Sequence, residues 1–307
     1  MKVIQSVLIT GANAGLGFEA ARQLAHKNTI TKIYLACRNE DKANQAKQQL
    51  VELTNRDIFE IVTIDVSDSR SVKSAVSNLH SAFDAVILNA GGTGGKTPNA
   101  LTADGVTTIF ASNVFGHTVL VDELIKRQLV TSTIVYAGSE TARGIPKMGV
   151  AKPELLNTSV AEFTAIANGS KFGGAADPLD VYGTIKLTGA LWMSSMSRKY
   201  PHLRFITMSP GGTAGTNGMD DLPFVKKVFF KYLGNLMMPM LGMMHSVDKG
   251  AKRYVDALFD DQFQSGRFYA SKMGSPTGPV VDQATIDPLF GMETAQDNAR
   301  LAIQTLS

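Results

Sequence analysis

Short apolar runs alternate with longer amphipathic stretches along the first half of the chain. The apolar runs are rich in β-branched residues, as is typical of strands buried on both faces of a parallel sheet. The stretches between them carry apolar residues at helical spacing. The predicted strands are Val3–Ile9, Lys32–Cys37, Phe59–Ile64, Ala85–Leu88 and Thr133–Ala137, and the predicted helices are Phe18–His26, Asp41–Leu53, Asp68–His80 and Val114–Leu129.

Strands that alternate with helices in this way indicate βαβ units. We therefore predict an α/β fold, a doubly wound parallel sheet of the Rossmann type with helices on both faces. Ligands of such sheets bind beyond the carboxyl ends of the strands. The residues that directly follow each predicted strand are thus the first candidates for a functional site.

The second half of the chain is less regular. Pro178–Tyr200 predicts a long helix, because proline is tolerated in a first helical turn. Leu203–Met208 predicts a strand that ends before Pro210. The remaining predicted elements are a strand at Arg267–Ala270 and helices at Val247–Phe259 and Thr294–Leu306.

No linker divides the chain. We expect a single Rossmann-type domain over residues 1–307, with an insertion at 141–176 and a small apolar substrate lobe at about 212–246.

Composition narrows the function classes. A hydrophobic fraction of 44% with 19% charged residues indicates a globular chain rather than a disordered one. The net charge of +3 is small and the basic residues are scattered, so we expect no nucleic-acid partner. A single cysteine, Cys37, excludes an intrachain disulfide and fits a reducing compartment. With no signal peptide visible at the N-terminus, we expect a cytoplasmic protein.

A glycine-rich loop follows the first predicted strand. Residues 10–17 are Thr-Gly-Ala-Asn-Ala-Gly-Leu-Gly, and a predicted helix begins there. Glycines permit a tight turn and let backbone N–H groups approach a pyrophosphate at the positive end of a helix. This context predicts dinucleotide binding, with candidate contacts at Gly11, Asn13, Gly15, Leu16 and Gly17.

The second predicted strand ends at Cys37-Arg38 and offers no acidic residue before Glu40. An acid there would bind a free ribose 2′-hydroxyl, whereas an arginine pairs with a 2′-phosphate. Arg38 therefore predicts NADP(H) rather than NAD(H).

Tyr182 and Lys186 lie four residues apart within a predicted helix, so both side chains project from one face. A nearby ammonium favours the phenolate form of tyrosine. Such a tyrosine can donate a proton to a carbonyl oxygen or accept one from an alcohol. The spacing alone is also that of an ordinary surface pair.

The motifs form an ordered set that resembles the short-chain dehydrogenase/reductase family over nearly the whole chain. The set comprises the glycine loop, Asp65-Val66, Asn89-Ala90-Gly91, Asn113, Ser139, the Tyr182/Lys186 pair and Pro210-Gly211. The resemblance implies that Tyr182 is the general acid/base, that Lys186 lowers its pKa and holds the nicotinamide ribose, and that Ser139 binds the substrate oxygen. It further implies a water-mediated proton relay at Asn113. The implied cofactor contacts are Asp65 and Val66 at the adenine, Asn89, Ala90 and Gly91 along the cofactor, and Pro210 and Gly211 near the nicotinamide.

Two departures from the family pattern stand out. Ser139 and Tyr182 are 43 positions apart, which places an insertion between them, and glycine stands at position 138 where a second serine is more usual. The insertion and the Ala-Cys-Arg-Asn sequence at 36–39 look similar to the retinol dehydrogenase and light-dependent protochlorophyllide reductase branch.

The segment after Pro210 is rich in methionine and phenylalanine. Methionine adapts to irregular apolar ligands, so the segment suggests a lid over a hydrophobic substrate; core packing, a homo-oligomer contact and peripheral membrane contact are the alternatives. The most apolar stretch, Val228–Met244, is interrupted by Lys231, Asn235 and Pro239 and is too short to span a bilayer.

The sequence thus predicts an NADP(H)-dependent oxidoreductase that transfers a hydride between nicotinamide and a carbonyl or alcohol carbon of a hydrophobic small molecule. The alternatives are a light-dependent, protochlorophyllide-like reduction of a carbon–carbon double bond, and a non-catalytic NADP(H)-binding regulator. The histidines show no metal-ligand spacing, so we expect no metal.

Overall fold

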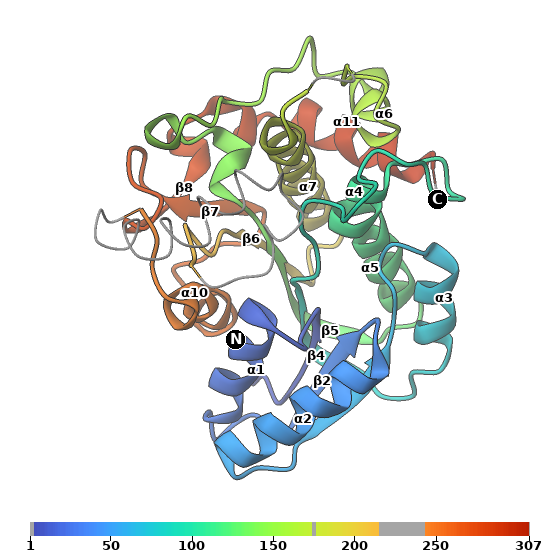
Figure 1. Ribbon diagram of the computed structural model, residues 1–307, viewed down its shortest axis with the longest axis vertical. Coiled ribbons are helices and arrows are strands. Elements are labelled where there is room, and N and C mark those ends of the chain that lie inside the picture. Colours follow the sequence, from blue (N-terminus) through green and yellow to red (C-terminus); the bar gives the residue numbers. More distant parts are fainter. Residues whose placement is uncertain (1–2, 174–175, 215–242, 307) are drawn as a thin grey trace.

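The computed structural model describes residues 3–173, 176–214 and 243–306. A twisted sheet of eight strands crosses its centre in the order β3-β2-β1-β4-β5-β6-β7-β8 (Figure 1). The first seven strands of this order are parallel, and β8 pairs antiparallel to β7 at the edge. The strands are β1 Ser6–Thr10, β2 Lys32–Cys37, β3 Phe59–Thr63, β4 Phe83–Leu88, β5 Val130–Ala137, β6 Arg204–Met208, β7 Arg267–Ser271 and β8 Val280–Asp282.

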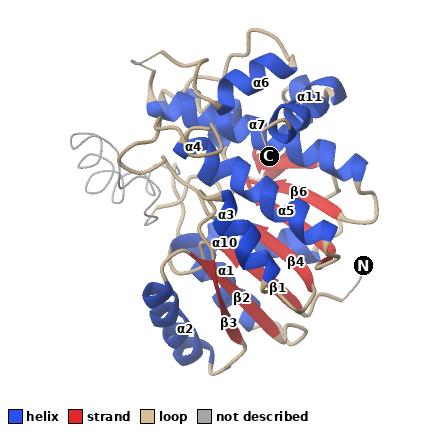
Figure 2. Ribbon diagram, turned by 90° about the vertical axis from the view of Figure 1, so that its right-hand side faces the viewer, coloured by secondary structure: helices blue, strands red, loops and turns tan. Residues whose placement is uncertain are grey.

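Helices cover both faces of the sheet (Figure 2), which confirms the doubly wound α/β prediction. Helices α1 (Gly15–Ala25), α2 (Glu40–Thr54) and α10 (Val247–Phe259) pack on one face. The other face is covered by α3 (Ser69–Ser77), α4 (Thr108–Phe110), α5 (Gly116–Lys126), α6 (Val160–Ala167), α7 (Pro178–Lys199) and α11 (Glu293–Gln304).

Each face of the sheet has its own apolar core, and this explains the uninterrupted apolar runs in the sequence. In β1, Val7 and Ile9 pack into the core beneath α1 and α10, whereas Leu8 packs into the core beneath α5 and α7. Successive side chains of a strand point to opposite faces, so a strand covered on both sides needs apolar residues at every position.

The insertion at 141–176 is more ordered than its sequence indicates. It carries the end of a 3₁₀ turn at Glu140–Arg143, a second 3₁₀ turn at Pro146–Met148, and α6. Helix α6 packs against α7 and α11, burying Phe163 and Ile166. The insertion therefore helps to enclose α7, the helix that carries Tyr182.

The helix predicted to begin at Val114 begins earlier, and that boundary was wrong. It starts at Thr108, where the Thr107 hydroxyl accepts a hydrogen bond from Phe110 N (3.4 Å). A π-helical segment, Ala111–Phe115, then widens the helix before α5. Asn113 thus lies inside a helix rather than in front of one.

The widened segment ends where Gly116 meets the backbone of Val66. A Cβ on Gly116 would stand 1.6 Å from the Val66 carbonyl oxygen, a backbone atom that cannot rotate away. Gly116→Ala is therefore expected to lower the free energy of unfolding by about 2–4 kcal/mol, measured by urea denaturation. Gly291→Ala is the matched control, because its Cβ would lie 3.8 Å from the nearest atom. Equal losses in the two variants would contradict this close approach.

The apolar lobe predicted at about 212–246 falls largely on residues 215–242, outside the described part of the chain. Its two described ends meet in a parallel bridge between Thr213 and His245. The chain therefore leaves and re-enters the described structure at one place. Among the described residues, no helix combines the length and apolar character needed to cross a membrane.

Candidate functional site

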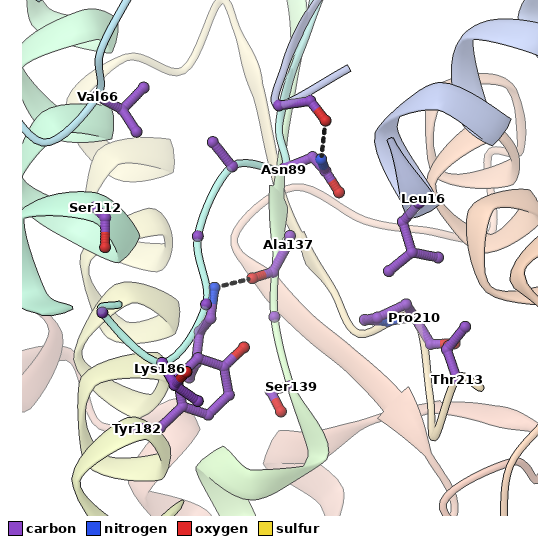
Figure 3. Close-up of a pocket in the computed structure, with 18 of the residues that line it drawn as sticks. Leu16, Val66, Asn89, Ser112, Ala137, Ser139, Tyr182, Lys186, Pro210 and Thr213 are labelled. Carbon is purple, nitrogen blue, oxygen red and sulfur yellow. Dashed lines mark hydrogen bonds between the residues drawn. The ribbon is translucent and has the colours of Figure 1, made fainter. Parts of the chain in front are cut away.

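A pocket of about 630 Å³ opens at the carboxyl ends of the parallel strands, where such folds bind ligands (Figure 3). The chain turns outward from β1 to β2 and β3 and then crosses back to β4, so the pocket lies at the topological switch point. Fifteen predicted site residues line it: Gly11, Asn13, Gly15, Leu16, Arg38, Asp65, Val66, Asn89, Ala90, Gly91, Ser139, Tyr182, Lys186, Pro210 and Gly211. The two remaining ones, Gly17 and Asn113, lie behind this lining.

The glycine loop carries an uncapped helix N-terminus. Gly11 and Gly15 adopt positive φ angles of 66° and 56°, which bend the chain sharply between β1 and α1. Ala14 at the N-cap offers no side-chain hydrogen bond, and the first turn holds no acidic residue. The free N–H groups and the helix dipole therefore favour an anion at this end of the pocket.

Gly17 and Asn89 fix the loop against its neighbours. The Asn89 amide donates to Thr10 O at 2.9 Å and to Gly11 O at 3.3 Å, which ties the end of β4 to the end of β1. A Cβ on Gly17 would stand 2.5 Å from Gly11 O and 2.6 Å from the Asn89 amide. Only glycine leaves room for this approach, so Gly17 acts from behind the pocket wall.

Arg38 and Asp65 meet at one rim of the pocket. Arg38 Nη1 lies 3.6 Å from Asp65 Oδ2, and the arginine side chain is 76% exposed. Asp65 Oδ1 is occupied by Ser67, whose backbone N donates at 2.9 Å and whose hydroxyl donates at 2.6 Å. An exposed pair at this distance is weak, so the Arg38 guanidinium is available to an anionic ligand.

Ser139 and Tyr182 lie on facing sides of the other end of the pocket (Figure 3). Ser139 follows β5, and its Oγ accepts hydrogen bonds from Thr141 N (3.2 Å) and Thr141 Oγ1 (2.8 Å). With both acceptor positions of this oxygen taken, its own O–H is directed elsewhere. Tyr182 is partly buried on α7, and its side chain faces Ser139.

Lys186 is buried one turn along α7 from Tyr182, at 2% exposure. Its Nζ donates to Ala137 O at 2.9 Å and lies 4.9 Å from the centroid of the Tyr136 ring. Burial lowers the pKa of Lys186 to about 7. A lysine in this setting gains and loses its charge near neutral pH.

The pKa of Tyr182 moves opposite to the direction expected from Lys186. Burial and the negative charge of Glu140 raise the pKa of the phenol, and the facing Ser139 hydroxyl only partly offsets them. Lys186 does not reverse this shift, and burial lowers its own pKa to about 7. The protein alone therefore holds Tyr182 in its protonated form.

The side chain of Asn113 is hydrogen-bonded to the backbone of Gly92 and does not line the pocket. Its amide Nδ2 donates to Gly92 O at 2.8 Å, and its Oδ1 accepts from Gly92 N at 3.2 Å. Its carbonyl oxygen accepts from Tyr136 OH at 2.9 Å and lies 3.3 Å from His117 Nδ1. The Asn113 carbonyl oxygen thus already has two protein partners, and the water-mediated proton relay at this residue stays a prediction.

The sequence analysis missed several pocket residues. They come from the insertion and from elements remote in sequence: Glu140, Ile145, Met148, Leu179, Ser209 and Tyr254. Glu140 alone carried a signal, because a carboxylate directly after a buried strand and a candidate serine needs partners.

The donor groups of the pocket fit a dinucleotide with an anionic middle and two ends of different character. The N-terminus of α1 suits a pyrophosphate, Arg38 suits a further phosphate, and Lys186 supplies a buried donor at the opposite end. Among the described residues, no three His, Cys, Asp or Glu side chains gather as they would around a metal ion.

The family model for short chain dehydrogenases matches residues 5–150. Over these residues the chain matches the short-chain dehydrogenase/reductase family. This is a family of oxidoreductases that use a nicotinamide cofactor, either NAD or NADP.

Similar curated proteins match part of their length. The chain is 29% identical to the short chain dehydrogenase rstn4 of Aspergillus nomiae over 66% of this chain and 56% of that protein. It is 29% identical to the WW domain-containing oxidoreductase of Gallus gallus, over 64% of this chain and 45% of that one. The match thus spans about half the length of these relatives.

Solved structures share the fold at low sequence identity. L-sorbose reductase from Gluconobacter frateurii, solved with NADPH and L-sorbose, superimposes with a TM-score of 0.62 at 16% identity, over 89% of this chain and 96% of that one. Salutaridine reductase from Papaver somniferum gives a TM-score of 0.60 at 19% identity, over 86% of this chain and 99% of that one.

Proposed function

We propose that this short-chain dehydrogenase/reductase is an NADP(H)-dependent oxidoreductase acting on a carbonyl or alcohol carbon of a hydrophobic small molecule. The observation that carries the proposal is that Ser139, Tyr182 and Lys186 converge (Figure 3) in a pocket that is also lined by the glycine loop and Arg38.

In this proposal the bound nicotinamide supplies or accepts the hydride. The Ser139 hydroxyl, whose oxygen is already held by Thr141, donates a hydrogen bond to the substrate oxygen. Tyr182 donates the proton to that oxygen in reduction or accepts it in oxidation. Lys186 holds the nicotinamide ribose and supplies positive charge, while Asn113 keeps the Gly91–Gly92 backbone in place.

The substrate end of the pocket supports a hydrophobic ligand. Ile145 and Met148 from the insertion, Leu179 from α7 and Met244 all line the pocket. These side chains offer apolar contact but few hydrogen bonds, so they favour a substrate with one polar group at the reacting carbon.

Cytoplasmic location and self-association stay predictions. One relative, TIC 32 B of Brassica napus, is named as chloroplastic.

Arg38 is the proposed reader of the 2′-phosphate. Arg38→Ala is expected to raise the Kd for NADPH about tenfold or more and to leave the Kd for NADH within about twofold, because only NADPH carries the phosphate. Fluorescence titration measures both constants. Arg70→Ala is a control, since Arg70 is similarly exposed but pairs with Asp68 away from the pocket. Equal losses for both cofactors would show that Arg38 does not select between them.

The whole proposal is tested by titrating the purified protein with NADPH and NADH, followed by turnover on a panel of apolar aldehydes, ketones and quinones. Tight NADPH binding with turnover is the expected result. Tight binding without turnover on any member would favour the non-catalytic regulator. Binding of neither cofactor would overturn the proposal.

A further inference from the structure

A buried carboxylate stands directly beside Ser139. Glu140 is 3% exposed, yet it lines the pocket. A carboxylate taken out of water costs several kcal/mol unless donors surround it. Here Ser209 Oγ donates to Oε2, while Ser271 N and Ser271 Oγ donate to Oε1 at 3.1 and 2.9 Å. The guanidinium of Arg253 lies 3.5 Å from the same Oε1.

These partners come from different parts of the fold. Glu140 follows β5, Ser209 follows β6, Ser271 is the last residue of β7, and Arg253 belongs to α10. Arg253 also donates to Ser209 O at 3.3 Å. The Glu140 carboxylate thus joins the ends of the neighbouring strands β5, β6 and β7 to helix α10, which lies on the face of the sheet opposite α7.

The segment held most closely by this network is the Ser209–Gly211 turn. Gly211 N donates to Ser209 Oγ at 3.2 Å, so the hydroxyl that bonds Glu140 also shapes the turn. Gly211 has a positive φ of 81°, and a Cβ there would stand 2.5 Å from His245 Nε2 and 2.9 Å from Arg253 Nη1. Pro210 lies across the pocket from Tyr182, on the side of Leu16 (Figure 3).

We propose that Glu140 is a positioning residue of this site, which locks the Ser209–Gly211 turn to the ends of β5 and β7 and thereby sets the cofactor-facing wall opposite Tyr182. The proposal rests on the proposed function, because it assigns that wall to the cofactor. Glu140 acts through Ser209 and Ser271 and is not itself a proton donor in the reaction.

The charge of Glu140 has a second, separable effect. It raises the pKa of Tyr182 together with burial. The other ionisable groups interacting with Tyr182 are Tyr136 of β5, Tyr254 of α10 and Lys186 of α7, and none of these carries a negative charge near neutral pH. Removing the Glu140 charge should therefore make Tyr182 give up its proton at lower pH.

Three variants separate the effect of the length of the Glu140 side chain from the effect of its charge. Glu140→Gln keeps the length of the side chain and removes its charge, whereas Glu140→Asp keeps the charge and withdraws it by one methylene. Glu162→Gln is the matched control, because Glu162 is also buried (6% exposed) and paired with Lys171, but lies outside the pocket. NADPH affinity is measured by fluorescence titration, and the pH profile by oxidation of decan-1-ol or cyclohexanol with NADP⁺.

Glu140→Gln is expected to raise the Kd for NADPH about tenfold and to shift the rising limb of the oxidation profile down by about one pH unit. Glu140→Asp is expected to raise the Kd while leaving that limb in place, and Glu162→Gln to change neither. A Kd within twofold of wild type in both Glu140 variants would overturn the inference. If Glu140→Gln yields no folded protein, Glu140→Asp and Ser271→Ala decide the question by the same Kd criterion.

The outcome is distinguishable from failure of the proposed function. A wild-type protein that binds neither cofactor would remove that function whatever Glu140 does. A wild type that binds NADPH, with variants that bind it equally well, would remove only the role of Glu140.

Discussion

Tyr182→Phe is expected to reduce turnover about a thousandfold while leaving the Kd for NADPH within about twofold of wild type. The substitution removes one hydroxyl, and general acid catalysis of this kind contributes about 10²–10⁴ to a rate. The ring still packs against the core beneath α7, and Lys186 keeps its bond to Ala137 O. The loss should therefore appear in kcat, measured by NADPH consumption, and not in cofactor affinity.

Tyr200→Phe provides the control for this result. Tyr200 caps the far end of the same helix and lies outside the pocket, so its hydroxyl has no part in the proposed chemistry. Turnover in that variant should stay near wild type. If Tyr182→Phe also kept wild-type turnover, the proton would come from another group and the assignment of Tyr182 would fail.

The sequence was most informative where the chemistry is local. The glycine loop, Asn89-Ala90-Gly91 and Pro210-Gly211 each directly follow a buried strand, and parallel strands deliver their carboxyl ends to one edge of the sheet. Recognising the strands therefore placed these residues in one pocket. Tyr182 and Lys186 joined them because their helix crosses the same edge.

The network around Glu140 could not be predicted in the same way. Ser209 and Ser271 are 69 and 131 positions from Glu140, and no spacing rule connects them. The direction of the Tyr182 pKa shift likewise depends on burial and on the charge of Glu140, and neither can be read from the helical spacing of Tyr182 and Lys186. Helix α6 was not predicted because small residues obscure the helical spacing of its apolar positions. Strand β8 was not predicted because it is only three residues long.

Lys186→Met is expected to abolish most turnover and yet to stabilise the protein. Lys186 is enclosed by the core, and among the described residues its ammonium donates one hydrogen bond, to Ala137 O. Holding an ammonium there is unfavourable, which is why burial lowers the pKa of Lys186 to about 7 from its ordinary value of 10.5. Methionine fills similar space without charge and is a good helix former. After allowance for the lost hydrogen bond, a gain on the order of 2 kcal/mol in the free energy of unfolding is expected at pH 7.

The pH dependence of this gain identifies its cause. Because the pKa of Lys186 is lower in the folded than in the unfolded protein, the unfolded chain binds more protons between about pH 7 and 10.5. The cost of Lys186 is therefore fully present below pH 7 and disappears as the pH rises through that window. The stability difference between Lys186→Met and wild type, measured by urea denaturation, should be largest at pH 6–7 and shrink toward pH 10. A difference that stayed constant with pH would mean that packing rather than the buried charge is responsible.

Lys199→Met is the control, because Lys199 lies at the exposed end of α7. It should show neither the gain in stability nor its pH dependence. Lys186 would then destabilise the fold in exchange for its proposed role in the reaction, because the site needs a cation beside Tyr182 and the cofactor.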